Sequence, residues 1–220
     1  MKELISVTTK KGDKGESFLI SGKKISKSNI VFEVLGTLDE LNSHLGLVVV
    51  KMKNLKTVDQ LPTNSMELKS IKKIPSKTTK PESVKEIVSS AIFLLEVQDT
   101  LFYLGAQLAE SSKESLKISQ LKKLEKEADD LQRKMADNWI VKFVLPGGTE
   151  LGAHIDIART VSRRLERLIV ALSEENLTTK NPVPEIILQY VNRLSDYLFI
   201  LRCFVNDRLS FEEKLFESKK

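Results

Sequence analysis

The amino-acid sequence predicts an all-α protein, an antiparallel five-helix bundle with a basic N-terminal arm and a long loop between the first two helices. Five segments repeat apolar residues at steps of three and four, which is the spacing of one helix face. No run of alternating apolar and polar residues indicates a strand, and abundant Leu and Lys with few aromatic residues favour helix. We therefore treat residues 1–220 as a single helical domain.

The first helix is predicted to begin at Ile30, after the arm of residues 1–29. Its apolar face is formed by Val31, Val34, Leu38, Leu41, Leu45 and Val48. Residues 52–82 contain three prolines, many lysines and little periodicity, so we expect a flexible insertion there. This insertion separates the first two helices.

Four further helices follow the insertion. Ser83, with Glu86 three residues later, is the expected N-cap of the second helix. The third is expected from about residue 119, and the sequence Pro146-Gly147-Gly148 separates it from a fourth that runs from about 149 to 175. Pro182 and Pro184 precede a fifth helix, in the position where a helix start tolerates proline.

The composition is that of a globular protein and indicates no membrane span. With 41% hydrophobic and 30% charged residues, the chain is typical of a globular protein with a real core. The single cysteine, Cys203, stands in an apolar run and is expected to be a buried small side chain. Because no stretch approaches the ~20 apolar residues of a membrane span and the N-terminus has no apolar signal region, we expect a cytoplasmic protein without a membrane partner.

The positive charge of the chain is unevenly distributed. The net charge is +5, but residues 1–29 carry +4 and residues 51–85 carry +6, so the remainder is mildly acidic. This pattern does not predict a uniformly basic nucleic-acid binder. The basic arm can hold a polyanion such as a nucleotide phosphate, or it can serve solubility alone.

The fourth helix carries an unusual concentration of arginines, in the sequence ARTVSRRLER of residues 158–167. Arg159, Arg163 and Glu166 share one face, and Arg164 and Arg167 lie beside it. The stripe is either a solvated face of Glu–Arg helical pairs or a cluster of planar donors for a phosphate chain. The sequence leaves both interpretations open.

Other polar residues interrupt apolar faces. Asn192 and Asp196 point the same way on the fifth helix, and Asp39 in the first helix could pair with an arginine of the fourth. The turn Lys10-Lys11-Gly12-Asp13-Lys14-Gly15 brings backbone N–H groups and lysines together but lacks the Walker spacing. With only two histidines, His44 and His154, and no cysteine beside them, a zinc site is not expected.

Several of these segments together resemble one known family, the PduO-type cob(I)alamin adenosyltransferases. The resemblance rests on TKKGDKG (residues 9–15), ISK (25–27), EVLGTLDELN (33–42), FVLPGG (143–148), ARTVSRRLER (158–167) and VNRLSDYLF (191–199). These motifs occur in the family's order and cover nearly the whole chain outside residues 52–82. The chain departs from the family at Lys11, where a threonine is usual.

The resemblance implies a fold and an activity. It implies a five-helix bundle, usually a homotrimer with active sites between subunits, that transfers the 5′-deoxyadenosyl group of ATP to cob(I)alamin and releases triphosphate. It also implies Mg²⁺ on the phosphates, a reductase that supplies reduced cobalamin, and an adenosylcobalamin-dependent enzyme that uses the product. The rival hypotheses are a binding protein without catalysis on the same fold, and a structural bundle whose basic segments touch nucleic acid.

The resemblance also implies the site residues. On the arm side of the ATP site these are Thr9, Lys10, Lys11, Gly12, Ser17, Phe18 and Lys27. On the helical side they are Arg163, Arg164, Glu166, Arg167 and Asn192. Asp39 and Arg159 match positions expected to pair across the subunit boundary. Phe102 is a candidate for the apolar wall beneath the corrin, where displacement of the lower cobalt ligand makes Co(II) easier to reduce.

Overall fold

The structure is a computed structural model that describes residues 8, 10, 12–55, 80–111, 113, 115–135, 143–177 and 182–216. In these residues the chain forms five helices and one small sheet. The helices are α1 (Ile30–Lys53), α2 (Pro81–Leu108), α3 (Ile118–Lys134), α4 (Glu150–Leu177) and α5 (Glu185–Arg208). The sheet pairs β1 (Glu16–Phe18) with β2 (Lys24–Ser26). The predicted all-α bundle is confirmed.

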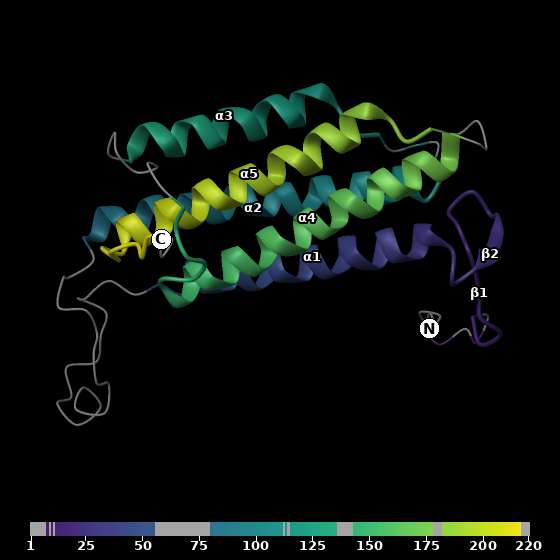
Figure 1. The fold of residues 1–220 in the computed structure, drawn as a ribbon, viewed down its shortest axis with the longest axis horizontal. Coiled ribbons are helices and arrows are strands. Elements are labelled where there is room, and N and C mark those ends of the chain that lie inside the picture. Colours follow the sequence, from purple (N-terminus) through teal and green to yellow (C-terminus); the bar gives the residue numbers. More distant parts are fainter. Residues whose placement is uncertain are drawn as a thin grey trace, which may run out of the picture.

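The helices lie side by side, and the chain reverses direction from each helix to the next (Figure 1). Helix α1 packs against α2 and α4, and α5 packs against α2, α3 and α4. Helix α3 therefore lies outside a four-helix core and is attached to it through α5. The hairpin of β1 and β2 lies beyond the end of the bundle where α1 begins and α4 ends.

Local signals set where the first two helices begin. The side chain of Asn29 accepts a hydrogen bond from the backbone N–H of Val31 at 3.0 Å and caps α1. The predicted N-cap at Ser83 is wrong, because α2 begins at Pro81 with Lys80 as its N-cap. Proline fits the first turn of a helix, since its missing N–H would have no helical partner there. The ends of the predicted insertion are thus helical, and residues 56–79 lie outside the described residues.

The small hairpin in the arm is a feature that the sequence did not predict. Strands β1 and β2 are antiparallel, with Ser17 opposite Ile25, and each has three residues. Gly22, in the connection between them, has a φ of +86°, which disfavours most other residues. A ladder this short gives too little alternation to be recognised from sequence.

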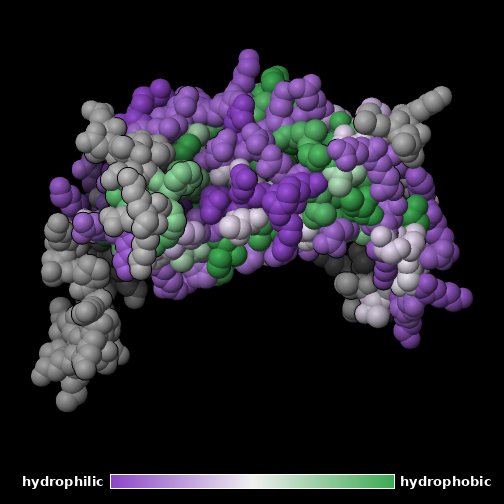
Figure 2. Space-filling model, in the orientation of Figure 1, coloured by the Kyte–Doolittle hydropathy of each residue, from purple (hydrophilic) through white to green (hydrophobic). Residues whose placement is uncertain are grey.

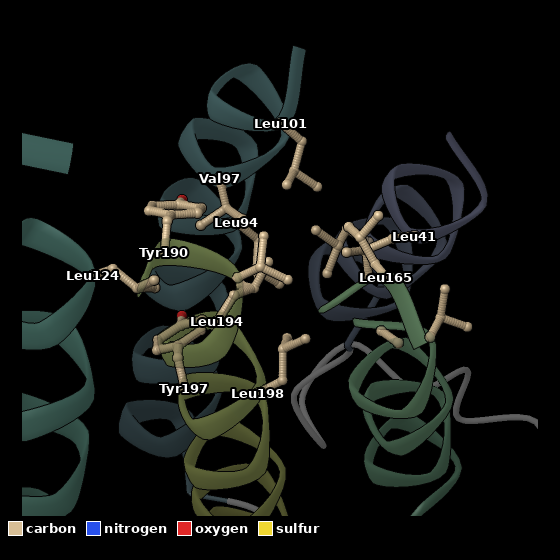
Figure 3. Close-up of a cluster of buried hydrophobic side chains, with 14 of the residues drawn as sticks. Leu41, Leu94, Val97, Leu101, Leu124, Leu165, Tyr190, Leu194, Tyr197 and Leu198 are labelled. Carbon is tan, nitrogen blue, oxygen red and sulfur yellow. The ribbon is translucent and has the colours of Figure 1, made fainter. Parts of the chain in front are cut away.

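The core of the bundle receives side chains from all five helices (Figure 3). Leu41 of α1, Leu94 and Leu101 of α2, Leu124 of α3 and Leu165 of α4 are each fully buried. Helix α5 contributes Tyr190, Leu194, Tyr197 and Leu198, all at most 1% exposed. Because α5 is buried on most of its faces, it serves as the central helix of the bundle.

Helix α2 is the one helix in the described part of the chain that is long and apolar enough to cross a membrane. Half of its most apolar stretch is buried inside the bundle. Its apolar composition is therefore that of a core helix, and length and composition alone are weak evidence for a span.

A cluster of charged and polar side chains is buried near the C-terminal end of α5. Arg202 is 1% exposed and donates to Asp156 at 3.2 Å, to Glu213 at 2.6 Å, and to the carbonyl oxygens of Leu145 and Gly147 at 2.8 and 3.1 Å. Burial disfavours its charge, but contacts with Cys203 and the two carboxylates outweigh burial and raise the pKa of Arg202. A buried charge of this kind is stable only when its donors are satisfied.

The same cluster holds the C-terminal segment against the loop before α4. Val144 forms an antiparallel bridge with Leu215, and the Phe216 N–H donates to the carbonyl of Phe143 at 2.8 Å. Asn206, fully buried, donates to Glu213 at 2.9 Å and accepts from Thr149. Residues 211–216 are thus part of the folded structure.

Substitution of Leu94 by alanine should destabilise the bundle strongly, because this fully buried side chain leaves a cavity between helices. We expect a loss of about 3 kcal/mol in the free energy of unfolding. Leu95, its neighbour, is 39% exposed and is the matched control, with an expected loss below about 1 kcal/mol. Urea unfolding measures both. Equal losses would contradict the orientation of α2.

The two glycines of the loop before α4 should differ in their tolerance of alanine. Both have positive φ, +115° at Gly147 and +102° at Gly148, so either substitution strains the backbone by about 1–3 kcal/mol. A Cβ at Gly147 meets open space, whereas one at Gly148 collides with the buried side chain of Asn206. We expect Gly148→Ala to lower the melting temperature clearly more than Gly147→Ala. The reverse order would contradict this packing.

Candidate functional site

The arm side of the predicted site is built at the base of the hairpin. The Lys27 N–H donates to the carbonyl of Gly15 at 2.9 Å, which folds the end of β2 back on the turn before β1. A Cβ at Gly12 would lie 2.7 Å from Lys27 Nζ, so the absence of a side chain at Gly12 allows the ammonium group to lie there. Lys10 has a left-handed backbone, with φ of 58°. The structure therefore brings Lys10, Gly12 and Lys27 into one turn region.

Two more predicted arm residues lie on β1. Ser17 is half-buried and Phe18 is 52% exposed. Phe18 therefore presents an aromatic ring on the surface of the hairpin, where a large apolar side chain has no core to fill. Thr9 and Lys11, predicted from the same motif, lie outside the described residues.

The helical side of the predicted site is an exposed face of α4. Arg163, Arg164 and Arg167 are all exposed, and one Arg167 nitrogen donates to the backbone carbonyl of Arg163 at 3.0 Å. Among the described residues, the Arg163 guanidinium has no hydrogen bond or ion pair. The cationic stripe therefore contains at least one arginine with donors available for an outside anion.

Glu166 and Asn192 meet between α4 and α5. The Asn192 amide donates to Glu166 at 2.8 Å, and its own oxygen accepts from Arg193, also at 2.8 Å. Arg193 in turn donates to Glu125 of α3 at 3.3 Å. This chain of contacts fixes which way the Asn192 amide faces, so three helices support the polar groups beside the arginines.

The predicted ion pair of Asp39 with α4 does not occur within the chain. Arg164 instead pairs with Glu40, the next residue along α1. Asp39 is exposed and has no ion pair in the part of the chain that the structure describes, and Arg159 donates to Asp156 at 3.0 Å. Adjacent residues of a helix point about 100° apart, so the sequence, which pointed to Asp39, could not show which of the two acids faces α4.

The two sides of the predicted site lie apart in one chain. The hairpin is at the C-terminal end of α4, while Arg163 lies fourteen residues before that end, about 20 Å along the helix. Figure 2 shows a mainly hydrophilic face with hydrophobic patches between the polar side chains. Helices α1 and α4 also carry exposed apolar side chains, at Leu47 and Val50 of α1 and at Ile157 and Val170 of α4.

Two exposed aromatic rings are separated by the length of the bundle. Phe102, the predicted wall residue, is 68% exposed near the C-terminal end of α2. Phe143 is 86% exposed in the loop before α4, at the other end. Phe143 was not predicted as a site residue by itself, although it lies in the motif FVLPGG. Phe143 stands out in the structure because its side chain is exposed, and the exposure of a side chain cannot be read from an isolated sequence motif.

A pocket of about 610 Å³ opens at the hairpin end of the bundle. Its walls come from the arm, the end of α2 and the connection between α4 and α5, including Lys23, Glu110 and Pro182. None of the predicted site residues that the structure describes lines it. In the described part of the chain, no three His, Cys, Asp or Glu residues gather as a metal site, and Cys203 is buried, which raises the pKa of its thiol.

Comparison with known proteins identifies the family. The family described as cobalamin adenosyltransferase matches residues 7–205. A corrinoid adenosyltransferase from Bacillus subtilis is 32% identical over 91% of this chain and 86% of its own length. A cobalamin adenosyltransferase from Cupriavidus metallidurans is 30% identical over 92% of this chain and 89% of its own length.

Solved structures agree with this result. A variant of the PduO-type ATP:corrinoid adenosyltransferase from Lactobacillus reuteri, complexed with cobalamin and ATP, matches with a TM-score of 0.71 at 25% identity. The match covers 97% of this chain and all of that chain. Another variant, complexed with ATP, matches with a TM-score of 0.70 at 26% identity over 96% of this chain and all of that one. The chain therefore belongs to the cobalamin adenosyltransferase family, as an enzyme of the PduO type.

Proposed function

We propose that this protein transfers the 5′-deoxyadenosyl group of ATP to the cobalt of cob(I)alamin, giving adenosylcobalamin and triphosphate. The observation that carries the proposal is the exposed arginine face of α4, supported by the Glu166–Asn192 contact, in a chain of this family. Arginine forks match phosphate oxygens in geometry and charge. A face of this kind suits a triphosphate.

The reaction needs positioning more than acid–base chemistry. Cob(I)alamin is a strong nucleophile, and its cobalt donates an electron pair to C5′ of ATP while the bond from C5′ to the triphosphate oxygen breaks. Negative charge grows on the departing triphosphate. Arg163, Arg164 and Arg167 of α4, with Lys10 and Lys27 of the arm, would stabilise this charge.

Mg²⁺ belongs to the proposal as a partner of the nucleotide. Mg²⁺ commonly binds through substrate phosphates and water, so we expect the ATP phosphates to supply most of its ligands. When bound, Mg²⁺ would neutralise part of the triphosphate charge.

We propose that the site is completed between copies of the chain, in a homotrimer. Because Arg163 lies about 20 Å along α4 from the hairpin end, the arm of another copy of the chain would complete the clamp on ATP. Asp39, exposed without an ion pair among the described residues, would pair with Arg159 of another copy. The exposed Leu47 and Ile157 would lie at that boundary.

We propose a cytoplasmic protein that acts between a reductase, which supplies the electron for cobalamin, and an adenosylcobalamin-dependent enzyme. Apolar side chains that displace the lower axial ligand would make Co(II) easier to reduce, and Phe102 is the proposed wall residue for this step.

An anaerobic spectroscopic assay tests the activity. Purified protein, MgATP and chemically reduced cob(I)alamin are mixed, the cobalamin spectrum is followed, and photolysis tests for a cobalt–carbon bond. We expect a light-sensitive product that depends on both protein and ATP. Binding of both ligands without product would instead support the non-catalytic binder, and salt-sensitive DNA binding without ATP binding would support the structural bundle.

Arg163→Ala should lower kcat/KM for ATP by roughly a hundred-fold, since it removes a donor from the growing charge of the leaving group. Arg133 is the matched control, because it is an arginine with a side chain 68% exposed on α3 that pairs only with Asp130 among the described residues. Arg133→Ala should leave the rate unchanged. A wild-type rate for Arg163→Ala would end the phosphate-clamp role of this residue.

Phe102→Ala should slow the reaction that starts from cob(II)alamin and a reductant more than the reaction that starts from cob(I)alamin, because the wall acts on Co(II). Ile92, 58% exposed on the same helix, is the matched control, and Ile92→Ala should change neither rate. Phe143→Ala is measured in parallel. If Phe143→Ala slows the reaction from cob(II)alamin while Phe102→Ala remains fully active, the wall residue is Phe143 in the loop before α4 and not Phe102.

A further inference from the structure

The buried carboxylate of Asp156 connects two parts of the molecule. The residue is 6% exposed, and its two oxygens have different partners. Oδ2 accepts from Arg202 at 3.2 Å and from the Gly147 N–H at 2.8 Å, and Oδ1 accepts from Arg159 Nε at 3.0 Å. Because two donors fix Oδ2, the direction of Oδ1 is fixed as well.

The guanidinium of Arg159 is only partly satisfied by the described residues. Its side chain is 21% exposed, and only Nε has a partner in the described residues, which is Asp156. The two terminal nitrogens are therefore available to an acceptor outside this chain. An arginine held at Nε presents these nitrogens in one plane, so the orientation of the carboxylate sets the direction in which Arg159 donates.

The C-terminal segment holds the other side of this carboxylate. Glu213 accepts from Arg202 at 2.6 Å and from Asn206 at 2.9 Å, and the backbone of residues 214–216 pairs with that of 143–145. Glu213, Arg202, Asp156 and Arg159 thus form one continuous series of charge-assisted contacts. It runs from the end of the described chain to the exposed face of α4.

We infer that Asp156 is a positioning residue for Arg159, and that the C-terminal segment fixes it through Glu213 and Arg202. The inference rests on the proposed function, in which Arg159 completes a site between copies of the chain. Asp156 itself would touch neither substrate. It acts by aiming the guanidinium of Arg159, and its own position depends on residues 46 and 57 places later in the chain.

Double-mutant cycles on kcat/KM for ATP test the inference. We expect Asp156→Asn to lower kcat/KM by roughly ten-fold, the effect of losing a charged hydrogen-bond partner. In the Arg159→Ala background the same change should have almost no further effect, because its target is already gone. In the Arg167→Ala background it should keep its full effect. A general loss of stability would act equally in both backgrounds.

Variants of the C-terminal segment extend the test. Glu213→Gln should weaken activity in the same Arg159-dependent way, while Glu212→Gln, an exposed neighbour without an ion pair in the described residues, should not. If Asp156→Asn does not fold, Glu213→Gln takes its place in both cycles. Additive effects with Arg159→Ala would overturn the inference.

The same data separate this inference from the proposed function. Full activity of Arg159→Ala would remove the role of Arg159 itself, and the proposal of a site between copies would fail with it. An impaired Arg159→Ala together with a fully active Asp156→Asn would leave the proposed function intact and overturn only the positioning role.

Discussion

Burial of one face of α4 against α1 and α5 determines where every arginine of the proposed site lies. Ile155, Ala158, Leu165 and Ile169 are fully buried on that face. In a helix of 3.6 residues per turn, this places Arg163 and Arg167 on the solvent side. The arginines need no support from one another to stay exposed, since the apolar face cannot turn outward without losing the core.

Contacts along the seam between α4 and α5 also orient the polar groups beside these arginines. Glu166 meets Asn192 in the middle of the seam, and Asp156 meets Arg202 near the start of α4. These two polar contacts therefore support the arginine stripe from the side of α5 at two separate levels. The helices supply a rigid frame, and these contacts select how the polar groups on the frame are oriented.

The helices could be predicted from sequence because their signal is local. Val34, Leu38, Leu41 and Leu45 repeat with the period of a helix, and the structure buries all four. The start of α2 was placed at Ser83 because a capping box is a strong signal, but proline at the first turn decided the boundary. The β1–β2 hairpin could not be predicted, because a strand of three residues shows almost no alternation of apolar and polar residues.

The candidate site was predicted less completely than the fold. Motifs identified the arginines and Asn192, whose helical positions the structure then supplied. They could not identify Asp156 or Glu213, because the partners of these residues are far away in sequence and become visible only when α5 has packed. The sequence pointed to Asp39 as the acid that faces α4, whereas the structure pairs Glu40 with Arg164, because the choice depends on the rotation of α1.

The closure of the loop before α4 by residues 211–216 has a consequence for the order of folding. During synthesis, Asp156 leaves the ribosome before Arg202, and Arg202 before Glu213. The contact of Asp156 with Arg202, and that of Arg202 with Glu213, can therefore form only after the later residues have emerged. The start of α4 can therefore be completed only after α5 and residues 211–216 have been synthesised. Residues 211–216, which emerge after α5, complete a region whose first residues were made some seventy positions earlier.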